Sequence, residues 1–89
     1  MSPIILHKTM DQNPDHRALL VRITIRTEQC GGRPCIRGMR IRVADILDLL
    51  ANGLSPQRVI EELPDLELAD VQAALVYARR LMDHPILAA

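Results

Sequence analysis

The chain has almost no aromatic side chains from which to build a core, because Tyr77 is the only aromatic residue among 89. Leucine, isoleucine and valine must take that role, and together they number 27. Each such side chain contributes about 2 kcal/mol when it is fully buried, and the conformational entropy of the chain cancels most of the sum. With 48% apolar and 25% charged residues, the sequence predicts one small globular domain with an aliphatic core.

The same lack of aromatic residues excludes several kinds of binding protein. Modules for single-stranded nucleic acid and aromatic cages for quaternary ammonium groups both need several exposed rings. No apolar run approaches the roughly 18 residues of a membrane span, and residues 1–12 lack the basic and apolar regions of a signal peptide. We therefore expect a cytoplasmic protein without membrane contact. In that reducing compartment Cys30 and Cys35 are expected to be free thiols, with a disulfide across their short loop as the alternative.

The charges cancel over the whole chain but are unevenly distributed along it. Residues 17–42 contain seven arginines and one glutamate, whereas residues 43–89 contain eight carboxylates and three arginines. A basic half followed by an acidic half favours a defined contact with an anionic partner. The alternative is that the arginines pair with the acidic helices of the same molecule.

The first half of the chain has the pattern of a small β-hairpin. Residues 20–26 alternate apolar and polar side chains and predict a half-buried strand. The inward side chains of this strand are Val21, Ile23 and Ile25. A turn follows at 31–34, and residues 35–41 predict a short second strand in which Gly38 introduces a bulge or kink. Residues 1–17 have no sustained period and are expected to form a mobile N-terminal extension.

The second half of the chain has helical periodicity throughout. The three helices are expected from Val43 to Asn52–Gly53, from Ser55–Pro56 to Pro64, and from about Leu68 to Met82. The core face of the third helix is predicted to comprise Val71, Ala74, Leu75, Ala78 and Met82. The predicted fold is mainly α, with a short hairpin before three helices, in a single domain over 18–83 with a tail over 84–89.

One block of the sequence is far more specific than these periodicities. The run Cys-Gly-Gly-Arg-Pro-Cys-Ile-Arg-Gly-Met-Arg-Ile at 30–41 is followed by Asp-Ile-Leu at 45–47, Gly-Leu-Ser-Pro at 53–56 and Leu-Pro-Asp-Leu at 63–66. With Asp-Val at 70–71 and Ala-Ala-Leu at 73–75, the pattern resembles the prokaryotic family called domain of unknown function 433, over about Arg22 to Arg80. Met39 stands where that family commonly has threonine.

The resemblance implies a homeodomain-like helix-turn-helix bundle. Members of this family are often encoded beside a PIN-like ribonuclease and are described as the antitoxin of a type II toxin–antitoxin pair. The implied partner is therefore a cognate PIN-like toxin, which the chain would bind and inhibit, and the implied additional role is repression of its own operon. The alternative is a stand-alone helix-turn-helix transcriptional regulator that binds operator DNA without a toxin.

The start of the third helix is poorly suited to reading DNA. In a helix-turn-helix protein this region meets base edges, where Arg, Lys, Asn and Gln are the useful donors. Here it carries Glu67, Asp70 and Gln72, and only Gln72 suits a base. The more credible DNA contacts on the hairpin are Arg33, Arg37, Arg40 and Arg42. The alternative role of these arginines is to hold the loop by donating to carbonyl groups.

The third helix also has a second apolar stripe, roughly opposite its predicted core face. The candidate residues for a dimer or partner interface are Ala69, Ala73, Val76 and Tyr77 with Arg79 and Arg80. A helix that is apolar on two sides needs two partners, so we expect this stripe, or the tail at 83–87, to contact a second copy in a homodimer or higher oligomer, or a protein ligand. By position, Arg79 and Arg80 are candidates for entering the anionic pocket of a nuclease, in competition with the hairpin arginines. The alternative is that the alanines are only good helix formers on a wet surface.

Enzymatic interpretations are poorly supported. The histidines His7, His16 and His84 fall in the predicted extension and tail. The four-residue gap between Cys30 and Cys35 is wider than in the usual paired zinc knuckle, and no second pair follows. We therefore expect no catalytic residue, no metal and no cofactor.

Overall fold

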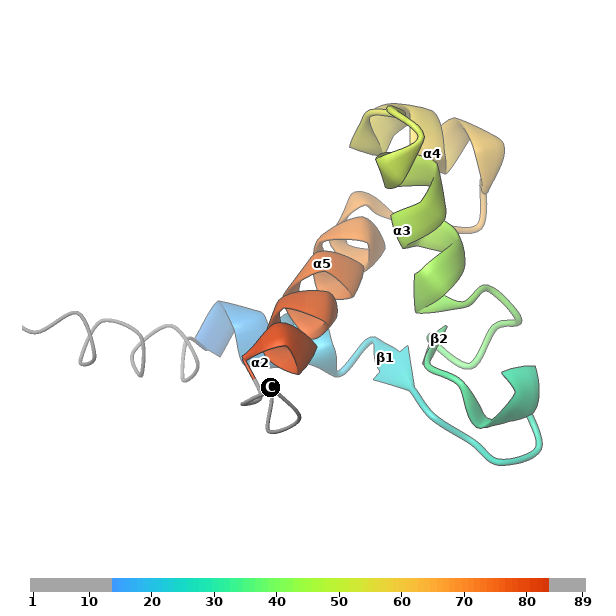
Figure 1. Cartoon of the computed structure of the whole chain (residues 1–89), viewed down its shortest axis with the longest axis vertical. Helices are drawn as coiled ribbons and strands as arrows, with labels where there is room; N and C mark the ends of the chain where they lie inside the picture. Colours follow the sequence, from blue (N-terminus) through green and yellow to red (C-terminus); the bar gives the residue numbers. More distant parts are fainter. Residues whose placement is uncertain (1–13, 84–89) are drawn as a thin grey trace, which may run out of the picture.

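The computed structural model describes residues 14–83, which form a small helical domain with one short hairpin (Figure 1). Its elements are α2 (Pro14–Leu20), β1 (Ile23–Thr24), a 3-10 turn (Cys30–Gly32), β2 (Cys35–Ile36), α3 (Val43–Ala51), α4 (Pro56–Glu62) and α5 (Leu68–Met82). The three predicted helices and the antiparallel hairpin before them are confirmed. Within 14–83, none of the helices has the length and apolar character needed to cross a bilayer.

Local chemistry fixes the ends of the three predicted helices. Asp45, at the third position of α3, accepts a hydrogen bond from the backbone N–H of Arg42 at 3.0 Å, which satisfies a donor at the helix start. Ser55 caps α4 by accepting from the backbone N–H of Arg58 at 3.2 Å. Gly53, with φ of 96°, lets the chain leave α3 in a conformation that other residues rarely adopt.

The hairpin is shorter than predicted. β1 and β2 pair antiparallel with Ile23 opposite Ile36 and Thr24 opposite Cys35. A tight turn follows β2 at once, because Arg37 and Gly38 both have positive φ, 46° and 70°. Positive φ at both central residues is typical of the hairpin turns that match strand twist. The predicted kink at Gly38 is therefore a chain reversal, and residues beyond Ile36 do not continue a strand.

The helix α2 corrects two predictions. Residues 14–17 were expected in a mobile extension and Leu20 in a strand, but all of them belong to α2, which packs against α5 (Figure 1). Because α2 runs to Leu20, the strand is reduced to two residues. Val21 and Ile25, predicted to face inward, are 80% and 58% exposed. Residues 1–13 and 84–89, the rest of the predicted extension and the predicted tail, lie outside the described residues.

The core is aliphatic, as predicted, and lies where α3, α4 and α5 meet the hairpin. The buried cluster consists of Ile36, Val43, Ile46, Val59, Leu66, Val71 and Ala74. Tyr77 packs partly against this cluster. The predicted core face of α5 is wrong at Leu75 and Met82, because both side chains lie on the exposed face of the helix.

The expectation of two free cysteines is also wrong, because Cys30 and Cys35 form a disulfide. Positive φ at Cys30, Gly31 and Gly32 reverses the chain within the 3-10 turn and brings the two cysteines together. Cys35 is buried in β2, directly before the core residue Ile36, so the disulfide links the loop to this strand.

Candidate interaction surface

One buried carboxylate organises the contact between the hairpin and α5. Asp70 is 0% exposed and lies in the first turn of α5. It accepts hydrogen bonds from Arg37 Nε at 3.0 Å and Nη2 at 2.8 Å, from Arg22 Nη1 at 3.0 Å, and from the backbone N–H of Glu67 at 2.8 Å. We call these four residues, Arg22, Arg37, Glu67 and Asp70, the Asp70 cluster. Every lone-pair direction of a buried carboxylate needs such a partner.

The cluster keeps Asp70 ionised. Burial alone would raise the pKa of this carboxyl, but the hydrogen bonds from Arg37, the Glu67 N–H and Arg22 outweigh that effect. The pKa of Asp70 therefore lies below its ordinary value. In the other direction, Glu67 and Asp70 raise the pKa of Arg22, and Asp70 raises that of Arg37.

Two of the four hairpin arginines predicted to bind DNA have structural partners. Besides Asp70, Arg37 donates to the backbone carbonyl of Asp65 at 2.9 Å. Arg42 pairs with Asp45 at 2.8 Å, and this hydrogen bond is the main cause that lowers the pKa of Asp45. Arg37 therefore holds a loop carbonyl, as the alternative expected, and its role in DNA binding stays a prediction.

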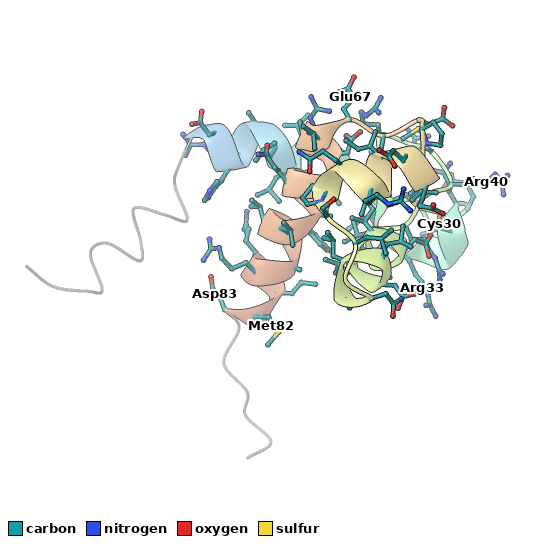
Figure 2. All side chains as sticks on the ribbon, turned by 90° about the horizontal axis from the view of Figure 1, so that it is seen from above. Cys30, Arg33, Arg40, Glu67, Met82 and Asp83 are labelled. Carbon is teal, nitrogen blue, oxygen red and sulfur yellow. A yellow bond between two sulfur atoms is a disulfide. The ribbon has the colours of Figure 1, made fainter. Side chains whose placement is uncertain are left out.

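The other two hairpin arginines are exposed, and Arg33 also borders an apolar pocket lined by Leu47 and Tyr77. Arg33 and Arg40 are exposed, and no carboxylate within 14–83 pairs with either. Figure 2 shows both at the end of the molecule that also carries Cys30. Arg26 is exposed as well, and its guanidinium lies beside the turn at Gly38. We call these three residues, Arg26, Arg33 and Arg40, the hairpin arginine patch.

The predicted interface stripe of α5 is partly covered by the chain itself. Ala73 is fully buried, which corrects its assignment to an external interface. α2 lies beside this stripe, because Ala18 and Leu19 border the same groove as Ala69 and Val76. The remaining polar residues of this group are Arg79, which pairs with Asp83 at 3.2 Å, and Arg80, which is exposed at the edge of a groove formed with Ile25 and Leu81.

The exposed face of α5 was not predicted. It comprises Leu68, Gln72, Leu75, Arg79 and Met82, of which Arg79 is half-buried. The sequence does contain the signal, since Leu68, Leu75 and Met82 are separated by seven residues each. By contrast, no local pattern announces the Asp70 cluster, because Arg37 and Asp70 are 33 positions apart.

Between residues 14 and 83, no three His, Cys, Asp or Glu side chains come close enough together to hold a metal ion. His16 lies in α2 rather than in an extension, at the groove between α2 and α5. His7 and His84 lie outside the described residues.

Comparison with known proteins gives a family match over the hairpin, α3, α4 and most of α5. The family model described as "Protein of unknown function (DUF433)" matches residues 23–78. The uncharacterized protein y4eO of Sinorhizobium fredii (strain NBRC 101917 / NGR234) is 34% identical over 56 residues, which are 63% of this chain and 25% of that protein. The chain therefore matches about a quarter of the length of that relative. No solved structure matches.

Proposed function

The chain belongs to the DUF433 family of proteins of unknown function, and we propose that it acts as an antitoxin-like protein that binds and inhibits a PIN-like ribonuclease. In this proposal α4, the turn at 63–67 and α5 form a helix-turn-helix unit of the homeodomain-like kind. In the proposal this unit acts by binding a protein and not by catalysis.

The observation that carries the proposal is the contrast between two sets of arginines. Arg22, Arg37 and Arg42 are neutralised by carboxylates of the same chain, at N–O distances of 2.8–3.0 Å. The hairpin arginine patch has no such partner within the described residues, although the chain as a whole has as many carboxylates as basic groups. In the proposal, an anionic partner provides the negative charges that pair with these arginines.

A PIN-like nuclease offers a suitable anionic surface. Such an enzyme gathers carboxylates around a divalent ion, and a guanidinium binds a carboxylate in a two-pronged, charge-assisted geometry. Arg33 and Arg40 extend from exposed positions beside the disulfide-linked loop, so either one can enter a concave active site. The inhibited enzyme then loses access to RNA because the rest of the domain covers the entrance.

The proposal is tested by co-expressing the chain with the product of the neighbouring gene, which the proposal predicts to be a PIN-like nuclease. We expect the wild-type chain to restore growth and to co-purify with the nuclease. The variant Arg33→Glu plus Arg40→Glu should lose both effects, whereas the matched control Arg17→Glu plus Arg58→Glu, which reverses two exposed arginines elsewhere, should retain them. Equal protection by the two double variants would remove the hairpin arginine patch from the proposal.

DNA binding is the second candidate, and the exposed Gln72 together with Arg33 and Arg40 favours it. Against it, the exposed face of α5 presents Leu68 and Leu75 where a recognition helix presents polar donors. A stand-alone regulator, or an antitoxin that represses its own operon, should retard a fragment of its own promoter at low salt. The variant Arg33→Glu plus Arg40→Glu should abolish that retardation without disturbing the Asp70 cluster.

A further inference from the structure

Two neighbouring pockets lie near the C-terminal end of α5, and Tyr77 and Leu81 line both of them. The first pocket, of about 200 Å³, lies between α3 and α5 and is also lined by Val43, Ala44 and Leu47. The second pocket, of about 310 Å³, lies between β1 and α5 and is also lined by Leu20, Ile23 and Ile25. Leu81 and Ile25 are 53% and 58% exposed, so these apolar side chains are accessible from solvent. We call the two pockets together the α5 double pocket.

Each pocket is bordered by an arginine whose charge is not balanced by a carboxylate. Arg33 lines the first pocket and Arg80 the second, both are exposed, and neither pairs with a carboxylate within residues 14–83. Arg42 also lines the first pocket, but it pairs with Asp45 at 2.8 Å and adds no net charge. Among the described residues that line the two pockets, none is an aspartate or a glutamate. The α5 double pocket therefore combines an apolar surface with two unbalanced positive charges.

We propose that the α5 double pocket binds an acidic segment of a partner protein, with one large apolar side chain in each pocket and carboxylates paired with Arg33 and Arg80. This proposal does not rest on the antitoxin function. Pockets for drug-sized ligands measure about 300–1,000 Å³. The first pocket is smaller than this range and the second is at its lower limit, so each suits a single side chain. Side chains inserted into such pockets carry much of the affinity of protein interfaces, and guanidinium–carboxylate pairs beside them add specificity.

The charges at the α5 double pocket favour a different protein over a second copy of this chain. In a two-fold dimer each surface patch meets the same patch of the other copy. The unbalanced Arg33 and Arg80 would then face the same two arginines, and like charges across an interface oppose association. An acidic partner instead provides the charges that both arginines lack. Arg33 also belongs to the hairpin arginine patch, whereas Arg80 belongs to the α5 double pocket alone, so Arg80 separates the two surfaces in an experiment.

A library of random peptides displayed on phage, selected on the immobilised full chain, tests the chemistry of the occupant. We expect the selected peptides to contain two large apolar residues and an excess of aspartate or glutamate. On the variant Arg33→Glu plus Arg80→Glu, basic residues should replace the acidic ones, because the sign of the charge beside both pockets is reversed. The control Arg17→Glu plus Arg58→Glu should keep the wild-type preference. The same acidic preference on both double variants, or no enriched peptide on the wild-type chain, would overturn the proposal.

NMR titration of the isotope-labelled full chain with a selected peptide locates the site. We expect the largest shifts at residues that line the two pockets, such as Leu47 and Ile25. Ala44→Phe adds an apolar ring at an exposed position of the first pocket and should raise the dissociation constant of the peptide about tenfold, because the ring takes the place of the bound side chain. The matched control Ala51→Phe, at the exposed last residue of α3, should leave the constant unchanged.

Single charge reversals separate this proposal from the antitoxin proposal. Arg80→Glu should weaken binding of the selected peptide, whereas Arg40→Glu, outside both pockets, should leave it unchanged. Far-UV circular dichroism verifies that each variant is folded. Shifts confined to α4, or a wild-type dimer that Leu81→Asp dissociates in sedimentation velocity, would overturn the proposal, the latter because a second copy would then occupy the α5 double pocket.

Discussion

Replacing Asp70 with asparagine tests whether the Asp70 cluster holds the fold together. Asp70→Asn keeps the shape of the side chain but removes its charge and turns one acceptor into a donor that faces Arg37. Breaking a fully buried ion pair by removing one partner costs about 3–5 kcal/mol. Here Arg22 and Arg37 keep side-chain exposures of 29% and 36% and can rehydrate. The expected loss is therefore smaller, about 2–3 kcal/mol of the free energy of unfolding.

The loss is measured by urea unfolding followed by far-UV circular dichroism. In a domain of this size it lowers the melting temperature by about 10–20 °C. The matched control is Glu67→Gln, which removes an exposed partner of Arg22 and should cost less than about 1 kcal/mol. An Asp70→Asn variant as stable as the Glu67→Gln variant would show that the cluster contributes no more than an ordinary surface ion pair.

The same cluster predicts how stability depends on pH. The folded-state pKa of Asp70 is depressed, so the unfolded chain binds more protons than the folded one at acidic pH. This contribution is fully present above the ordinary carboxyl pKa of about 4, and it is lost as the pH falls through the folded-state pKa. Urea unfolding at a series of pH values should thus show a steeper acid loss in wild type than in Asp70→Asn. If the free energy of unfolding fell equally with pH in wild type and Asp70→Asn below about pH 4, the depressed pKa of Asp70 would be contradicted.

Three further predictions concern the turns and caps. The double variant Cys30→Ser plus Cys35→Ala should lower the free energy of unfolding by about 2 kcal/mol, because the loop-closure model gives this value for so short a loop. An unchanged urea midpoint would refute this prediction. Ser55→Ala removes the cap of α4 and should cost about 1 kcal/mol, while the exposed control Gln57→Ala should cost nothing measurable. Gly38→Ala forces a side chain into positive φ and should cost about 1 kcal/mol by thermal unfolding; a stabilised variant would mean that the turn relaxes.

The sequence predicts the helices well because their ends are set by neighbours. Ser55 and Pro56 start α4, and α5 spans Leu68–Met82 as its periodicity indicates. Side-chain orientation within α5 is harder to predict from the sequence, because either of its two apolar stripes could face the core. Only the tertiary structure shows which one does. In one stripe Ala73 is buried and Ala69 and Val76 are partly buried beside α2, whereas Leu75 of the other stripe is left exposed.

The candidate site was less predictable for a related reason. Arginines in a basic segment look equivalent in a sequence. Only long-range contacts distinguish Arg37, which pairs with Asp70, from Arg40, which has no carboxylate partner within residues 14–83. The helix α2 was missed because it is only seven residues long and gains its stability from packing on α5 rather than from its own pattern.

The Asp70 cluster connects the hairpin arginine patch to α5. Arg37 occupies the turn that precedes Arg40, and its double hydrogen bond to Asp70 fixes this turn relative to the first residues of α5. Because the turn positions Arg40, loosening it through Asp70→Asn should weaken binding of the anionic partner in a pull-down. The control Glu67→Gln leaves the pair between Arg37 and Asp70 in place and should retain that binding. Equal binding by the two variants would show that the cluster does not position the hairpin arginine patch.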